Sequence, residues 1–172
     1  KQPFLLYVSH YAVHTPIEAP ADLVKKYEKK RNDLYQDTKT PYKSGRYDVS
    51  YRARQDHPAY AAMMENLDGN IGRVIKRLDE LNLTENTIVV FTSDNGGHPK
   101  MTSNQPLNNG KGFNYEGGIR IPAIISWQGK IKNITSNLPI ITMDMYPTLL
   151  DLAGIKLKPE QHLDGLSIKS IL

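Results

Sequence analysis

Two side chains that carry oxygen atoms, Asp94 and Asn95, directly follow a run of apolar residues in T-I-V-V-F-T-S-D-N-G-G. The run Ile88–Phe91 predicts a strand that is buried on both faces, as strands of parallel sheets are. Ligand sites of open α/β sheets lie just beyond the carboxyl ends of the strands. Because carboxylate and amide oxygens are the ligands that Mg²⁺ and Ca²⁺ prefer, the pattern indicates a divalent-cation site. Taken alone, the same residues also suit an ordinary D-N-G turn.

Two residues with side-chain nitrogen atoms follow similar logic. Lys111 lies between two glycines in G-K-G, where little hinders its ammonium group from approaching a tetrahedral oxyanion. His14 lies in H-T-P, on a loop that follows a predicted strand, Phe4–Ser9. If the two strands are parallel, His14 shares a rim with Asp94. The plain alternatives are an exposed flexible lysine and a structural histidine.

The elements that must position these residues alternate between strands and helices, which predicts an α/β fold with a mostly parallel sheet flanked by helices. Strands are predicted over Phe4–Ser9, Ile88–Phe91 and Ala123–Trp127, with Leu138–Thr142 extended, and helices over Ala21–Arg31, His57–Asn82 and Met143–Ala153. Between the first two helices, Asn32–Gln55 lacks periodicity and is predicted to be a long surface loop.

The second helix has the clearest pattern. Its apolar residues recur at helical spacing and predict one buried face: Tyr60, Met63, Met64, Leu67, Ile71, Val74, Ile75, Leu78 and Leu81. Gly69 and Gly72 interrupt the helix at a cost in propensity, which suggests close packing against another element. Farther along, Arg120 is predicted to pair with Glu116 and brace the loop that carries Lys111.

Composition removes several classes of function. The chain has 172 residues, enough for one domain, and it has no cysteine, which excludes disulfides, thiolate nucleophiles and cysteine-ligated zinc within it. The net charge of +4 favours anionic partners weakly, but no nucleic-acid-binding motif is present. No apolar run approaches the roughly 20 residues that cross a bilayer. The opening K-Q-P-F-L-L-Y-V resembles the approach to a strand and suggests a piece of a larger protein.

Four segments in register resemble one family, the type I sulfatases. They are Y-V-S-H-Y-A-V-H-T-P, S-D-N-G-G, N-N-G-K-G-F-N-Y-E-G-G-I-R-I-P and M-D-M-Y-P-T-L-L-D-L-A-G, and they follow the family order through nearly the whole chain. Each motif is weak alone, but four in order are specific. The resemblance implies the alkaline phosphatase-like α/β fold, in agreement with the elements predicted above.

The resemblance also implies roles for individual residues. Asp94 and Asn95 match the residues with which sulfatases help to bind a divalent cation, usually Ca²⁺, with Mg²⁺ as the alternative. Lys111 and His14 match a lysine and a histidine that contact the sulfate. Fixed positive charge around oxygens as an S–O bond breaks is the expected form of catalysis. The implied substrate is a sulfate ester, expected to be a sulfated carbohydrate, and export from the cell is expected.

The chain departs from the family in one respect. Sulfatases attack with a formylglycine made from the Cys or Ser of a C/S-x-P-x-R motif, and neither cysteine nor S-x-P-x-R occurs here. The family order places that motif, with further acidic metal ligands, upstream. Residues 1–172 are therefore expected to form the C-terminal part of a sulfatase catalytic domain, inactive alone.

Two other functions fit the same residues. A phosphodiesterase or phosphonate hydrolase of the same superfamily would use the same metal and lysine arrangement, because sulfate and phosphate esters are similar tetrahedral oxyanions. A non-catalytic module derived from a sulfatase would hold anionic glycans through Lys111, His14 and the basic loop. The nucleophile distinguishes these functions.

Overall fold

The longest element is helix α2, Pro58–Glu80, in a computed structural model that describes residues 2–37, 39, 41–44 and 50–172. The chain divides into two units, Lys1–Ile125 and Ser126–Leu172, and each is described by itself. Helix α2 starts where Pro58 occupies the first turn and the Nδ1 atom of His57 accepts a hydrogen bond from the Tyr60 N–H at 3.3 Å. The predicted helix His57–Asn82 is confirmed, two residues shorter at its end.

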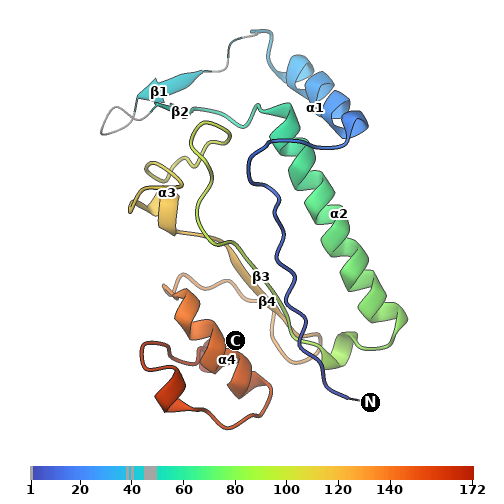
Figure 1. Ribbon diagram of the computed structural model, residues 1–172, viewed down its shortest axis with the longest axis vertical. Coiled ribbons are helices and arrows are strands. Elements are labelled where there is room, and N and C mark those ends of the chain that lie inside the picture. Colours follow the sequence, from blue (N-terminus) through green and yellow to red (C-terminus); the bar gives the residue numbers. More distant parts are fainter. Residues whose placement is uncertain (1, 38, 40, 45–49) are drawn as a thin grey trace. The chain divides into compact units, whose positions relative to one another are not determined.

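Helix α1, Ala21–Leu34, packs against α2 (Figure 1). It confirms the predicted helix Ala21–Arg31 and continues three residues farther. Lys26 on α1 forms an ion pair with Glu65 on α2, with a distance of 2.7 Å between the charged atoms. Because both side chains are partly exposed, this pair orients the two helices more than it stabilises them.

The apolar face of α2 is covered only in part. Ala62 and Met63 are buried, whereas Val74 and Ile75 nearer the C-terminal end are 41% and 45% exposed. Of the predicted face only Met63 is buried, and Met64 beside it is 46% exposed, so the prediction of one buried face is wrong for most of its residues. The predicted close packing at the two helix glycines is wrong, because a Cβ atom built on Gly69 or Gly72 meets no described atom within 4 Å.

The described strands form two pairs. Strands β1, Tyr42–Ser44, and β2, Ser50–Arg52, pair antiparallel, with Lys43 opposite Tyr51. They lie within the predicted surface loop Asn32–Gln55, so that prediction was wrong over these strands; residues 38, 40 and 45–49 of it lie outside the described residues. Nothing in the sequence of this stretch marks the strands, because neither shows the alternation of apolar and polar residues that identifies a half-buried strand.

Strand β3, Val89–Thr92, pairs with β4, Ala123–Ser126, and confirms two predicted strands, but β3 is half-buried or exposed rather than buried on both faces as predicted. The hydroxyl of Thr92 donates to the Pro122 carbonyl at 3.1 Å, so the end of β3 lies beside the start of β4. The whole connection between these strands therefore starts and finishes at one end of the pair. This arrangement positions the candidate site, and the described strands form two two-stranded sheets rather than one larger sheet.

The predicted first strand, Phe4–Ser9, is not a strand among the described residues. Leu5 and Tyr7 are 90% and 88% exposed, and the segment is extended without a ladder partner. An apolar run has the composition of a strand, but strand structure also requires backbone hydrogen bonds to a neighbour.

The second unit is built around helix α4, Met145–Leu152, which follows a short 3₁₀ turn at Thr142–Asp144. The helix is closed two residues later by Gly154, whose φ of 69° turns the chain so that the Ile155 N–H reaches the Leu150 carbonyl at 2.9 Å. The predicted helix Met143–Ala153 and its glycine stop are thus confirmed. Two further 3₁₀ turns follow, at Pro159–Gln161 and Lys169–Ile171.

Asp144 and Thr148 connect this helix to the tail of the chain. The Asp144 carboxylate accepts hydrogen bonds from the N–H groups of Ile141, at 2.8 Å, and Leu166, at 2.9 Å. The fully buried Thr148 hydroxyl accepts from the Ile168 N–H at 3.0 Å. The tail is therefore held by polar side chains of the helix start. None of the described helices is both long and apolar enough to cross a membrane.

Candidate active site

The first predicted site residues directly follow β3. Asp94 is exposed, and the Ser93 hydroxyl donates to the Asn95 carbonyl at 3.0 Å, which closes the turn. A hydrogen bond from the Asn95 side chain lowers the pKa of the Asp94 carboxyl below its usual value, and the nearby charge of Lys111 lowers it further. Asp94 is therefore ionised at neutral pH, beside an amide oxygen. These hard oxygen donors fit a divalent cation such as Ca²⁺ or Mg²⁺.

Glycines after β3 and before Lys111 let the turn after β3 touch the backbone of the Lys111 loop. The Gly96 N–H donates to the Gly118 carbonyl at 2.8 Å, and a Cβ atom on Gly96 would overlap the Gly117 carbonyl oxygen. In the same way, a Cβ atom on Gly110 would overlap the Gly97 carbonyl oxygen. The turn after β3 is thus in direct backbone contact with the loop that carries Lys111, which no side chain larger than hydrogen would permit.

Lys111 is held against that turn by its own backbone, since its N–H donates to the Gly97 carbonyl at 3.0 Å. Asn104 strengthens the same contact. Its side-chain oxygen accepts from the Gly97 N–H at 3.1 Å, and its side-chain nitrogen donates to the carbonyls of Gly97, at 2.9 Å, and Asn109, at 3.1 Å. One amide therefore ties the start of the connection to the residues just before Lys111. Sequence reasoning did not single out Asn104.

His14 lies on its predicted loop and is exposed. Its Nδ1 atom is 3.0 Å from the Thr15 carbonyl oxygen, which also accepts a hydrogen bond from the Tyr11 hydroxyl at 2.8 Å. A carbonyl can only accept, so this geometry assigns a proton to Nδ1 and leaves Nε2 available to a ligand. The tyrosine ring stands 5.2 Å from the imidazole, centre to centre, and supports its orientation.

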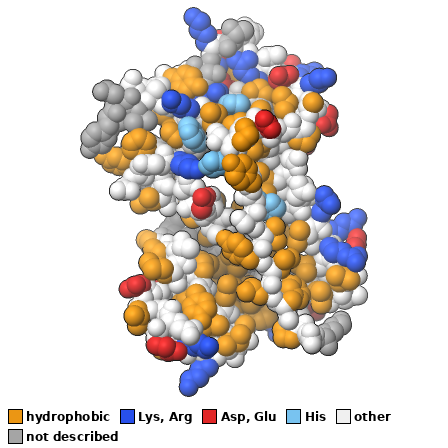
Figure 2. Space-filling model, viewed as in Figure 1, with side chains coloured by type: hydrophobic (Ala, Val, Ile, Leu, Met, Phe, Trp, Pro, Cys, Tyr) orange, Lys and Arg blue, Asp and Glu red, His pale blue; other side chains and the backbone are white. Residues whose placement is uncertain are grey.

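His98 is a further histidine of the site, which sequence reasoning missed. Its Nδ1 atom accepts from the Lys100 N–H at 3.2 Å. Partial burial lowers the pKa of His98, and the charges of Lys111, Lys100 and His14 lower it further. Its position directly after S-D-N-G-G was the available signal. Figure 2 shows histidine side chains beside lysine or arginine side chains in the upper part of the view.

The structure thus places Lys111 within electrostatic reach of Asp94 and of His98, and His14 within reach of His98. These residues come from two loops that are far apart in sequence. No three His, Cys, Asp or Glu side chains of the described residues come together to hold a metal ion. The cation site predicted at Asp94 and Asn95 therefore stays a prediction.

The outer part of the Lys111 loop rests on β2 and the residues after it. The Arg52 N–H donates to the Pro99 carbonyl at 2.7 Å, and its Nε atom donates to the Lys100 carbonyl at 3.2 Å. The Arg52 guanidinium pairs with the fully buried Asp56 carboxylate, to which Arg54 also donates at 2.9 Å. Arg52, from the region predicted as surface loop, is therefore buried in an ion pair with Asp56 just beyond it, and this pair supports the loop that carries Lys111.

The loop ends at helix α3, Glu116–Ile119. Arg120 pairs with Glu116 at 3.1 Å, which confirms the predicted ion pair. Both side chains are more than half exposed, so the pair braces the loop weakly.

The Sulfatase family model matches residues 1–155. The chain belongs to the sulfatase family. A "Sulfatase" of Formosa agariphila is 37% identical over 99% of the chain and 30% of its own length, and human steryl-sulfatase is 30% identical over 99% of the chain and 26% of its own length. The chain thus spans less than a third of the length of these curated relatives.

Solved structures agree with this membership. The crystal structure of Ps i-CgsB matches with a TM-score of 0.77 and 32% identity, over 96% of this chain and 32% of that one. The structure of Ps i-CgsB in complex with k-i-k-neocarrahexaose matches with a TM-score of 0.67 and 31% identity, over 91% of this chain and 30% of that one. The chain therefore has part of the sulfatase fold, which confirms the predicted alkaline phosphatase-like α/β class. Sulfatases in general use a metal ion and a formylglycine.

Proposed function

We propose that residues 1–172 are the C-terminal part of a sulfatase catalytic domain, whose full-length protein hydrolyses sulfate esters with a formylglycine encoded upstream. The observation that carries the proposal is the backbone contact between Lys111 and Gly97. It holds a lysine beside the Asp94–Asn95 turn, inside a chain that belongs to the sulfatase family. The chain alone, without a nucleophile, is expected to be inactive.

Each site residue receives a role under this proposal. Asp94 and Asn95 would hold a divalent cation, Ca²⁺ first and Mg²⁺ second, which supplies positive charge next to the sulfate oxygens. Lys111 binds a sulfate oxygen through its ammonium group. His14, with Nδ1 held by the Thr15 carbonyl, presents Nε2 to the sulfate or to the bridging oxygen. Fixed charges stabilise the charge that develops as the S–O bond breaks.

The proposed substrate is a sulfated carbohydrate, and the protein is proposed to act after export. The structural relative that binds a neocarrahexaose supports this substrate class, since it matches 91% of the chain. Measuring sulfatase activity in the culture medium and in washed cells tests export; activity confined to the cell interior would contradict it.

The decisive experiment measures hydrolysis of a chromogenic aryl sulfate and the matching aryl phosphate by the full-length protein. Lys111→Ala and Asp94→Ala are compared with Lys132→Ala, which removes an exposed lysine of the second unit. We expect sulfate to be cleaved and both site variants to lose at least about 100-fold in kcat/KM, because Lys111→Ala removes a positive charge at the sulfate and Asp94→Ala removes a proposed ligand of the cation. The control is expected to retain activity.

The outcomes separate the competing functions. Cleavage of phosphate alone would assign the protein to a phosphodiesterase or phosphonate hydrolase of the same superfamily. Binding of sulfated glycans without cleavage of either ester would make it a binding module. Full activity of both site variants would remove the assigned roles while leaving the family intact.

A further inference from the structure

His98 is held beside the Lys111 loop by contacts on both sides of it. On one side, the Gly97 carbonyl accepts the Lys111 N–H at 3.0 Å. On the other side, a Cβ atom built on Gly110 would lie 3.2 Å from the Cδ atom of Pro99. The backbone of His98 is therefore fixed opposite Gly110 and Lys111, where the sulfate is proposed to bind.

The backbone also fixes the tautomer of the His98 ring. Its Nδ1 atom lies 3.2 Å from the Lys100 nitrogen, and because a backbone N–H can only donate, Nδ1 accepts and the neutral ring carries its proton on Nε2. In the described part of the chain, no hydrogen bond uses this Nε2 atom, and it is not among the buried polar atoms that lack a partner. His98 therefore presents a free N–H to solvent or to a ligand.

Burial and nearby charges keep the His98 ring neutral. Partial burial is the largest cause that lowers the pKa of His98, and the charges of Lys111, Lys100 and His14 lower it further. The ring is therefore uncharged at neutral pH, and it still donates from Nε2. Because the oxygens of a sulfate group can only accept hydrogen bonds, this N–H suits them.

His14 has the opposite tautomer. Its Nδ1 atom donates to the Thr15 carbonyl at 3.0 Å, so the neutral ring has a lone pair on Nε2. A lone pair offers nothing to a sulfate oxygen, and His14 can donate to the sulfate only after its Nε2 atom has taken up a proton. The two histidines thus differ: His98 donates as a neutral ring, and His14 donates only as a cation.

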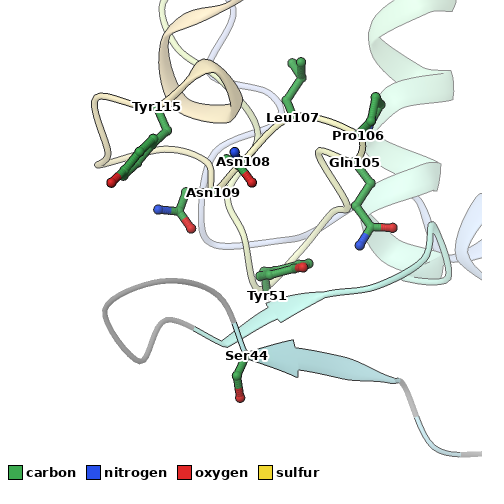
Figure 3. Close-up of a pocket in the computed structure, with 8 residues that line it drawn as sticks. All are labelled: Ser44, Tyr51, Gln105, Pro106, Leu107, Asn108, Asn109 and Tyr115. Atoms are coloured by element: carbon green, nitrogen blue, oxygen red, sulfur yellow. The ribbon is translucent and has the colours of Figure 1, made fainter.

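The free N–H of His98 does not open into the pocket on the outer part of the same loop. Figure 3 shows that pocket between the β1–β2 pair and the segment that runs into α3. Residues 105–109 line it, and His98 is not among the described residues that do so. A ligand of that pocket would therefore not account for the orientation of His98.

We propose that His98 is a sulfate-binding residue, which donates a hydrogen bond from Nε2 to a sulfate oxygen while its ring is neutral. The inference rests on the proposed sulfatase function and adds a third donor to Lys111 and His14. A neutral imidazole does not release its remaining proton at physiological pH, so His98 binds the sulfate without supplying a proton to the leaving group.

The test uses two substitutions that separate the roles of the two ring nitrogens. His98→Asn keeps a side-chain oxygen that can accept from the Lys100 N–H, as asparagine does in turns, and removes the Nε2 donor. His98→Gln places an amide nitrogen near the position of Nε2 and loses the acceptor for the turn. His162→Asn, in the second unit, is the matched control.

Binding of inorganic sulfate to the full-length protein is measured by calorimetry, beside kcat/KM for the aryl sulfate. We expect His98→Asn to raise the Kd for sulfate about 10-fold, as the loss of one hydrogen bond to an anion does, and to lower kcat/KM similarly. His98→Gln should raise the Kd less, and the control should leave it unchanged. The effect of His98→Asn should be the same at pH 7 and at pH 9, because a neutral donor keeps its proton.

Three results would overturn the inference. One is an unchanged Kd in His98→Asn, and another is a larger loss in His98→Gln than in His98→Asn, which is the order that a role in the turn alone predicts. The third is an effect of His98→Asn that disappears at pH 9, which would require a charged donor. A parent protein that neither binds sulfate nor cleaves the aryl sulfate contradicts the proposed function itself, so the two failures are distinguishable.

Discussion

The Lys111 loop is held by a buried charged group at Pro99 and Lys100 and by uncharged groups at Gly97 and Lys111. Near Pro99 and Lys100 it rests on Arg52, whose guanidinium pairs with the buried Asp56 carboxylate. Near Gly97 and Lys111 it is held by backbone contacts and by the neutral amide of Asn104.

The difference has a physical consequence. A buried ion pair holds backbone strongly, but its charges would attract or repel an anionic ligand across a region of low dielectric. A neutral amide holds the backbone less strongly, but it does not compete with a bound anion for the positive charge of Lys111. The chain therefore combines strong charged support at the outer part of the loop with uncharged support beside the proposed sulfate position.

Replacing Asp56 with asparagine should have the largest effect on stability. The Arg52 side chain is only 8% exposed, so the variant removes the negative charge of Asp56 from beside a buried cation. We expect the free energy of unfolding to fall by about 3–5 kcal/mol, measured by urea denaturation of the full-length protein. Asp37→Asn is the control, because Asp37 is 60% exposed where it pairs with Arg54, and it should cost less than about 1 kcal/mol. If Asp56→Asn and Asp37→Asn lowered the free energy of unfolding equally, the buried ion pair would not be more stabilising than the exposed one.

The same carboxylate gives a pH dependence with a defined sign. Burial raises the pKa of Asp56, but hydrogen bonds from Arg54 and Arg52 outweigh burial and lower it below its usual value. The native protein thus holds this proton less readily than the unfolded chain. The stabilisation is present above the unfolded pKa of about 4 and is lost as the pH falls through the lower folded pKa. Unfolding free energies measured from pH 6 to pH 2 should fall less steeply in Asp56→Asn.

Replacing Asn104 with alanine should have an intermediate effect on stability and a clear effect on catalysis. The variant removes three hydrogen bonds to backbone groups and leaves the partly buried Gly97 N–H unpaired. We expect a loss of about 1–3 kcal/mol in the free energy of unfolding. We also expect about a 10-fold fall in kcat for the aryl sulfate at a temperature where the protein stays folded, because Lys111 is no longer fixed.

Asn70→Ala is the matched control for this positioning role. The Asn70 amide donates to the Asn66 side chain at 2.6 Å within α2, away from the loop. This variant should lose stability without a change in kcat. A loss of kcat in both variants, or in neither, would show that Asn104 has no special role in positioning.

Replacing Arg120 with alanine should have the smallest effect. Its ion pair with Glu116 spans 3.1 Å between side chains that are 61% and 63% exposed. We expect the free energy of unfolding to change by less than about 0.5 kcal/mol and the urea midpoint to move little in 0.5 M salt. A loss comparable to that of Asn104→Ala would mean that exposed charge also holds this loop.

Several elements followed from the sequence because their causes are local. The regular spacing of apolar residues and Pro58 in the first turn predicted α2, and Gly154 predicted the end of α4. The run of β-branched residues before Asp94 predicted β3. The Glu116–Arg120 pair was predictable from its spacing of four residues.

The missed features depend on distant partners. Phe4–Ser9 has the composition of a strand, but the described residues provide it with no ladder. The C-terminal half of α2 is exposed, and a Cβ atom on Gly69 would meet open space. An amphipathic pattern thus predicts which face of a helix is apolar, but not whether another element covers that face. Arg52 lies in the predicted surface loop, but the fold buries it together with Asp56.

The sequence by itself determined the types of side chain at the site and their order along the chain: oxygen donors after a strand, a lysine between glycines and a histidine before a proline. These follow from residue identity and local conformational preference. Only the tertiary structure decided that Gly97 and Gly110 touch, that Asn104 ties the two segments together, and that His98 feels the charges of Lys111 and His14. Such contacts join residues separated along the chain, and their energies arise only when folding brings the backbone groups within hydrogen-bonding distance.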